Sequence, residues 1–214
     1  MDEEVTIIDS NTRNEKILNF FINNKKKLII GFSIIIILII GYLSVIEIKK
    51  KNKIKLANQF NIITISFNIE DKQKTIDRLT KLINEKDATY SPLALYFLID
   101  NNLIDNQGEI NILFDVLIKK TSLDQEIKDL IIYKKALFNS DLSSESDLLK
   151  ILNPIINSES VWKSHSLYLM AEYFYSKDQK QKAKEFFNQI ILLPNANIDI
   201  RAESQKRINR DLSE

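Results

Sequence analysis

The sequence contains no cysteine, and its 214 residues include only three glycines, three prolines and one histidine. Without cysteine the chain cannot form disulfides, use a thiolate as a nucleophile or bind a metal through sulfur. Glycine and proline are the residues that most often build turns, so their scarcity argues against β-sandwich and α/β folds, which change direction many times. The composition therefore predicts an all-α fold, made of long helices with short polar connections.

The same absences limit the chemistry available to the chain. His165 is the only histidine, so neither a catalytic triad nor a multi-histidine metal site can be built around it. The glycines at positions 31, 41 and 108 lie too far apart to form a phosphate-binding loop. We predict that the chain is not an enzyme and that it has no metal, no cofactor and no small-molecule substrate.

The charge pattern excludes one class of partner. After Lys55 the chain carries 20 basic and 23 acidic side chains, and no basic stripe runs along it. Proteins that bind nucleic acids usually present such a stripe to the phosphates. We therefore predict that the partners do not include nucleic acid.

What the sequence does contain is an apolar run of nineteen residues, LIIGFSIIIILIIGYLSVI, at positions 28–46. A helix needs about 20 such residues to cross the hydrocarbon core of a membrane. A cleavable signal peptide is the alternative, but its apolar region is shorter and ends in a small-residue pattern such as Ala-x-Ala, which is missing here. We predict a retained transmembrane helix at 28–46, a short tail at 1–27 and a folded domain at 47–214. An amphipathic pattern at 17–21 is either an interfacial helix within the tail or an extension of the membrane helix.

Lysines flank the apolar run on both sides. Five basic side chains precede the run from Arg13 onward and five follow it up to Lys55, so the positive-inside rule does not assign an orientation. The lysines after the run suggest contact with anionic lipid head groups, each contributing about 1 kcal/mol near such a surface. These residues are Lys49, Lys50, Lys51 and Lys53. The alternative is that they only end the membrane helix.

After the apolar run, hydrophobic residues recur with helical spacing almost to the end of the sequence. Local signals mark helix starts: Ser122 and Gln125 match a capping box, and Asp178 precedes another predicted helix as its N-cap. The predicted helices form pairs across short loops, and the first members of successive pairs begin near residues 89, 122 and 159. Intervals of this size are typical of helix–turn–helix solenoids, so we predict a solenoid for the domain.

The clearest repeat runs from Leu167 to Pro194 and reads LYLMAEYFYSKDQKQKAKEFFNQIILLP. It resembles a tetratricopeptide repeat, in which two helices carry small and large apolar residues in a set order. Alanines allow the two helices to approach closely, and larger side chains fill the space beside them. The residues that carry the resemblance are Leu167, Met170, Ala171, Phe174, Ala183, Phe187 and Pro194.

The whole arrangement resembles a bacterial family of membrane-anchored, tetratricopeptide-like proteins, similar to the ancillary subunit of the Sec translocon. The resemblance covers about residues 16–212 and rests on the anchor joined to 56–67, on Tyr90–Ala94 and on Val161–Ser166. It implies a cytoplasmic N-terminus and a periplasmic domain at the outer face of the inner membrane. It also implies a protein-binding scaffold, with translocon subunits or periplasmic chaperones as partners and no catalytic residues. The alternative function is a structural or assembly subunit of another cell-envelope or division complex.

Four residues of the repeat form a stripe of their own. His165, Tyr168, Glu172 and Tyr175 are spaced by three, four and three residues, so they share one helical face. Aromatic side chains with a polar tip suit the capture of peptides. The tetratricopeptide resemblance places this face in a concave groove, and we hypothesise that it binds protein. The alternative is that Tyr168 and Tyr175 only pack against the helix that follows.

Overall fold

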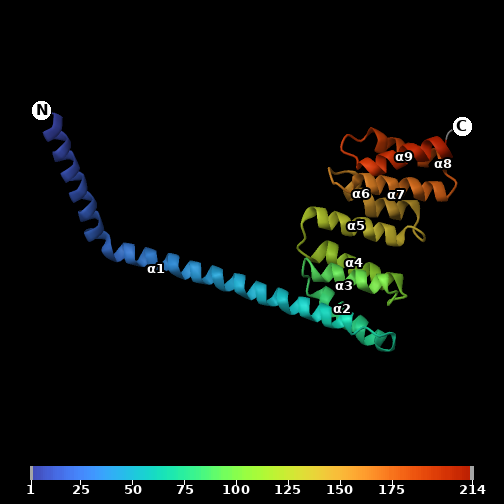
Figure 1. Ribbon diagram of the computed structural model, residues 1–214, viewed down its shortest axis with the longest axis horizontal. Coiled ribbons are helices and arrows are strands. Elements are labelled where there is room, and N and C mark those ends of the chain that lie inside the picture. The colour runs from blue at the N-terminus through green and yellow to red at the C-terminus, as the bar shows by residue number, and fades with distance from the viewer. Residues whose placement is uncertain (1, 213–214) are drawn as a thin grey trace. The chain divides into compact units, whose positions relative to one another are not determined.

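The computed structural model describes the backbone of residues 2–212 and the side chains of residues 13–212. The described residues form nine α-helices and one short 3₁₀ helix, with no strand among them (Figure 1). The prediction of an all-α fold is confirmed. The chain divides into two compact units, the first ending at Lys55 and the second beginning at Leu56.

Helix α1 (Asp2–Ile65) contains the apolar run and continues through the predicted boundaries at residues 27 and 46 without interruption. Between Leu28 and Ile46 its large apolar side chains are 39–68% exposed, and the helix is long and apolar enough to span a membrane. An isoleucine-rich segment favours strands in water, but a helix satisfies all its backbone polar groups internally, as hydrocarbon requires. The hydroxyls of Ser33 and Ser44 are also satisfied within the helix, because each donates to the carbonyl four residues earlier at 2.8 Å.

The second unit begins with the last turns of α1 and continues through helices that pack on their neighbours in the sequence. Figure 1 shows α2 to α9 in successive layers. Contacts also join α2 to α4, α5 to α7 and α7 to α9. The elements after α1 are η1 (Ile69–Asp71), α2 (Lys72–Asn84), α3 (Tyr90–Asp100), α4 (Gln107–Lys120), α5 (Gln125–Asn139), α6 (Glu145–Ile156), α7 (Lys163–Ser176), α8 (Lys180–Leu192) and α9 (Ile198–Asp211).

The interior of this unit consists of two hydrophobic clusters. One extends from Ile63 in α1 to Ile131 in α5, and the other from Ile132 in α5 to Leu212 after α9. Ile118 of α4 packs against both clusters, so they meet at the interface between α4 and α5. The residues that carry the tetratricopeptide resemblance in α7 and α8 belong to the second cluster and are buried, as predicted: Leu167, Met170, Ala171, Phe174, Ala183 and Phe187.

Two polar contacts fix how α4 and α5 lie against each other. The side-chain amides of Asn111 and Asn139 donate to each other's oxygens, both at 2.8 Å. Lys135 Nζ lies 2.7 Å from Asp115 Oδ1. Because these groups are partly shielded from water, sliding one helix along the other would leave them without partners. The interface therefore specifies one register between the two clusters.

Two of the predicted helix starts are wrong. Helix α5 begins at Gln125, whose side chain donates to Asp129 at 2.7 Å, so Ser122 and Gln125 do not form a capping box. Asp178 does not cap α8, because its φ of 56° places it in the left-handed region that ends α7. The N–H of Gln179 donates to the Phe174 carbonyl at 2.9 Å, and the N–H of Asp178 donates to the Tyr175 carbonyl at 3.0 Å. This pair of bonds is a Schellman motif without glycine.

Residues other than glycine also end α2 and α3 in the left-handed region. Lys86 follows α2 with a φ of 57°, and Asn102 follows α3 with a φ of 49°. Glycine usually occupies such positions, because a Cβ atom clashes with the neighbouring carbonyl there. This glycine-poor chain therefore ends three of its described helices with other residues, and Lys86 is the least suited of the three to the left-handed region.

Substitution of Lys86 by glycine tests this strain. Lys86→Gly should raise the free energy of unfolding by about 0.5–1 kcal/mol, because glycine adopts the positive φ without the clash. Lys150→Gly is the control: this exposed lysine lies inside α6, where glycine should lower the free energy of unfolding by about 1 kcal/mol. Urea denaturation followed by circular dichroism measures both. Destabilisation of similar size by both substitutions would contradict the strain at Lys86.

Candidate protein-binding surface

The four residues of the predicted stripe do not share one environment. Tyr168, Glu172 and Tyr175 lie next to α8 and α9, where Arg207 of α9 binds the Glu172 carboxylate through two nitrogens at 2.8 and 2.9 Å. The Arg207 guanidinium also lies 4.2 Å from the centre of the Tyr175 ring. The Tyr168 ring meets Phe187 edge to face, 5.5 Å between centroids. These contacts agree with the alternative given for the stripe, in which Tyr168 and Tyr175 pack against the C-terminal helix.

Burial affects Tyr168 at this contact, and ion pairs within α9 hold Arg207 and Asp211 together. Burial and the neighbouring Glu172 carboxylate together raise the pKa of Tyr168 to about 12, with burial the larger cause. Arg207 also pairs with Asp211, one turn later in α9. A hydrogen bond from Arg210 is the main reason why the pKa of Asp211 falls to about 2. This face of α7 is therefore occupied by the chain's own last helix.

His165, the remaining residue of the stripe, lies in a cluster of aromatic rings. Its ring centroid is 5.1 Å from that of Trp162 and 6.0 Å from that of Tyr133 in α5. The rings of Tyr133 and Trp162 stack on each other at 5.8 Å, with 21° between their planes. All three side chains are half-buried. The contact between α5 and α7 thus brings together an aromatic group that is open to solvent on one side.

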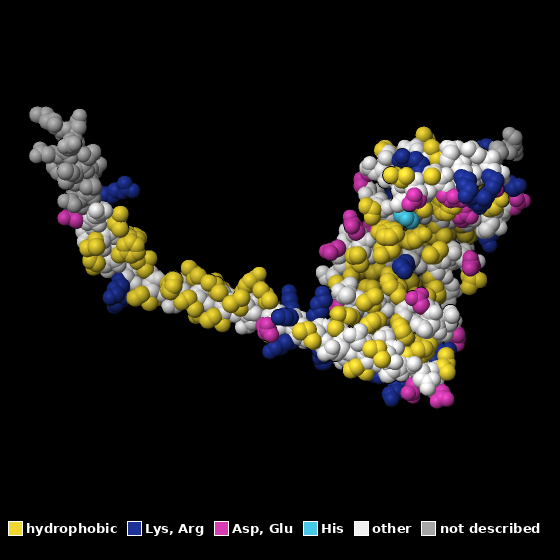
Figure 2. All heavy atoms as spheres, viewed as in Figure 1, with side chains coloured by type: hydrophobic (Ala, Val, Ile, Leu, Met, Phe, Trp, Pro, Cys, Tyr) yellow, Lys and Arg dark blue, Asp and Glu magenta, His cyan; other side chains and the backbone are white. Residues whose placement is uncertain are grey.

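A second contact extends this group to α3. Lys134, the neighbour of Tyr133 in α5, places its Nζ 4.2 Å from the centre of the Tyr96 ring. We call Tyr96, Tyr133, Trp162 and His165, together with Lys134, the aromatic surface. Figure 2 shows hydrophobic side chains gathered around the histidine on the face of the domain in view. The side chains of the surface thus come from α3, α5 and the start of α7.

Three of the four rings have a polar group without a hydrogen-bond partner in the described part of the chain, whereas His165 interacts with the backbone of Val161. Neither the hydroxyls of Tyr96 and Tyr133 nor the indole N–H of Trp162 makes a hydrogen bond to a described residue. Each ring therefore offers an apolar face and an available polar group. Such a combination can hold the side chains of a peptide and hydrogen-bond its backbone.

Sequence reasoning found His165 but missed its neighbours. Trp162 is the single tryptophan, which is a compositional signal, but no spacing links it to Tyr133 or Tyr96. Tyr96 lies in α3, Tyr133 in α5 and Trp162 directly before α7, and Tyr133 and Trp162 meet only through packing. The signal that joins them is tertiary, so a periodicity within one helix cannot show it.

The lysines proposed to contact lipid are exposed on α1. Lys51 lies 3.9 Å from Glu47, one turn earlier, whereas Lys49, Lys50 and Lys53 form no ion pair with a described residue. Lipid contact by these lysines remains a prediction. In the part of the chain with described side chains, no group of three or more His, Asp and Glu residues is placed to hold a metal ion.

Comparison with known proteins finds no protein-family model, no curated protein and no solved structure that matches the chain. The resemblance to the translocon-associated family therefore remains an expectation from sequence.

Titration of His165 provides a test of its environment. Burial lowers the pKa of His165, and the backbone of Val161 offsets only part of this effect. The unfolded chain, with a histidine pKa near 6.5, then binds more protons than the folded chain, so stability should fall as the pH drops from about 7 to 5. Urea denaturation across this range should show the slope in the natural chain and lose it in His165→Gln. An equal slope in both proteins would contradict the buried, neutral imidazole.

Proposed function

We propose that this chain is a membrane-tethered scaffold that binds proteins through the aromatic surface of a helical-repeat domain. The observation that carries the proposal is the group formed by Tyr133, Trp162 and His165, because it is a concentrated aromatic area on an otherwise mixed surface. Tryptophan and tyrosine are enriched among the residues that dominate binding energy at protein interfaces. A surface of this kind favours a protein or peptide partner.

The apolar run of α1 supports the tether. Its side chains are exposed throughout, and the helix is long and apolar enough to cross a membrane. A tether holds the domain beside partners in the same membrane and raises their effective concentration. Binding can then be functional even when the domain alone has modest affinity.

The order of the helices supports a repeat solenoid. The first helices of successive pairs begin at Tyr90, Gln125 and Lys163, so the interval is 35 and then 38 residues. Packing between sequence neighbours and between alternate helices is what a solenoid of helix pairs requires. In such a solenoid the first helices of the pairs line one face, as α3, α5 and α7 do at the aromatic surface.

The resemblance noted in the sequence suggests where the scaffold works. It favours a domain at the outer face of a bacterial inner membrane, beside the export machinery. Translocon subunits or periplasmic chaperones are then the expected partners.

Co-purification in mild detergent tests this function. The natural chain should recover translocon subunits or an envelope chaperone, and the double variant Tyr133→Ala, Trp162→Ala should lower that recovery at least tenfold, because interface aromatics of this kind often contribute 2 kcal/mol or more. The control Leu192→Ala changes a side chain that is 80% exposed on α8 and should recover partners normally. Circular dichroism should show all three proteins folded.

Two results would contradict the proposal. If the folded double variant recovered the same partners, the aromatic surface would not be the site that binds them. Recovery of one unrelated envelope complex in fixed stoichiometry, with no translocon subunit or chaperone, would instead favour an assembly subunit of that complex.

A further inference from the structure

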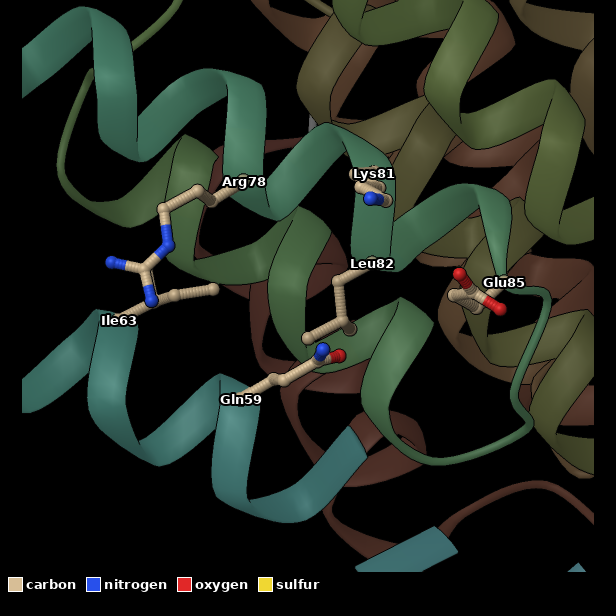
Figure 3. Close-up of a pocket in the computed structure, with 6 residues that line it drawn as sticks. All are labelled: Gln59, Ile63, Arg78, Lys81, Leu82 and Glu85. Atoms are coloured by element: carbon tan, nitrogen blue, oxygen red, sulfur yellow. The ribbon is translucent and has the colours of Figure 1, made fainter. Parts of the chain in front are cut away.

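A cleft of about 180 Å³ lies between the last turns of α1 and helix α2, apart from the residues of the aromatic surface (Figure 3). Pockets for drug-sized ligands span roughly 300–1,000 Å³, so this cleft suits a single side chain or a small group. The residues that line it are Gln59, Ile63, Arg78, Lys81, Leu82 and Glu85.

The cleft has an apolar floor and a polar rim. Ile63 and Leu82 are buried and form the floor. Figure 3 shows Arg78 and Glu85 on opposite sides of Leu82, with the amide of Gln59 reaching in from α1. An occupant would therefore meet hydrocarbon below it and charged groups around it.

Arg78 differs from the other arginines of the domain. Arg201 donates to the Leu193 and Pro194 carbonyls at 2.6 and 3.0 Å, while Arg207 and Arg210 bind carboxylates. Arg78 is half-buried, yet it makes no hydrogen bond or ion pair with any described residue. A guanidinium has five donors arranged to bind an oxyanion through two of them, so Arg78 is available for that role.

The charges of the cleft indicate what kind of anion fits. Lys81 lies one turn after Arg78 on α2, and Glu85 lies at the far rim, and neither forms an ion pair with a described residue. Two cations and one carboxylate leave one net positive charge, which matches a singly charged anion. Glu85 would repel a doubly charged one.

We propose that this cleft binds the side chain of a glutamate on a partner protein. The carboxylate would bind Arg78 and Lys81, and the two methylene groups would lie on Ile63 and Leu82. Arginine–carboxylate pairs of this form are among the strong hydrogen bonds of protein surfaces. The site lies on other helices than the aromatic surface and does not depend on it, so it provides a second, charge-specific contact.

An NMR titration of the full chain in mild detergent tests the site. The probes are N-acetyl-Leu-Glu-Leu-amide and its glutamine counterpart, which differ only in the charge of the central side chain. The acidic peptide should shift the backbone amides of Gln59, Arg78 and Lys81, and the neutral peptide should not. The double variant Arg78→Gln, Lys81→Gln should weaken the binding about tenfold or more, in line with the loss of hydrogen bonds to a charged group.

A matched variant controls for charge and folding. Lys120→Gln, Lys150→Gln removes the same charge from exposed lysines outside the cleft and should bind the acidic peptide normally. Because Arg78 has no partner among the described residues, its double variant should melt within a few degrees of the natural chain. A larger drop in melting temperature would identify Arg78 and Lys81 as structural residues and overturn the proposal.

Three titration results would also overturn it. Equal shifts with both peptides would show that the charge is not recognised. Unchanged binding by the Arg78 and Lys81 variant would place the site elsewhere. Tighter binding of dimethyl phosphate than of the acidic peptide would identify a lipid phosphate as the ligand. The variant Tyr133→Ala, Trp162→Ala should still bind the acidic peptide, so failure of the aromatic surface and failure of this cleft are distinguishable.

Discussion

Close contact between helices that follow each other in the chain is the interaction on which the domain depends. Small side chains make it possible: Ala94, Ala136, Ala171 and Ala183 are completely buried, each in a different helix. Without disulfides, the domain relies on this packing for its stability. The core follows the chain as two clusters joined at α4 and α5, where paired asparagines and an ion pair hold the register.

The same packing decides which surfaces remain open. Because α5 contacts both α6 and α7, Tyr133 meets Trp162 and His165 at the surface instead of entering the core. Helix α9 closes the other end of the stack, and Arg207 covers the face of α7 that contains Glu172 and Tyr175. At the beginning of the domain, α1 packs on α2 through Ile63 and leaves a charged cleft beside it. The order in which the helices pack therefore determines which of these surfaces are covered and which remain open.

Local patterns in the sequence were enough to predict the all-α fold, the long apolar helix and the burial of Leu167, Phe174 and Phe187, because helical periodicity and length are local properties. Helix ends were harder: a glycine-poor chain uses Asp178 in the left-handed region, and nothing in the sequence separates this role from an N-cap. The surroundings of the stripe were not predictable in the same way. Glu172 binds Arg207 thirty-five residues later, and Tyr133 and Trp162 meet through tertiary contacts alone.

We propose that α1 holds the domain to a membrane with its binding surface on the outer side. Protease treatment of intact and opened spheroplasts tests this claim most directly. The account predicts that protease added to intact spheroplasts removes the domain after Leu56 and leaves a protected fragment containing the apolar run at 28–46. A domain that resists protease until the spheroplasts are opened would contradict it, because the binding surface would then face the cytoplasm.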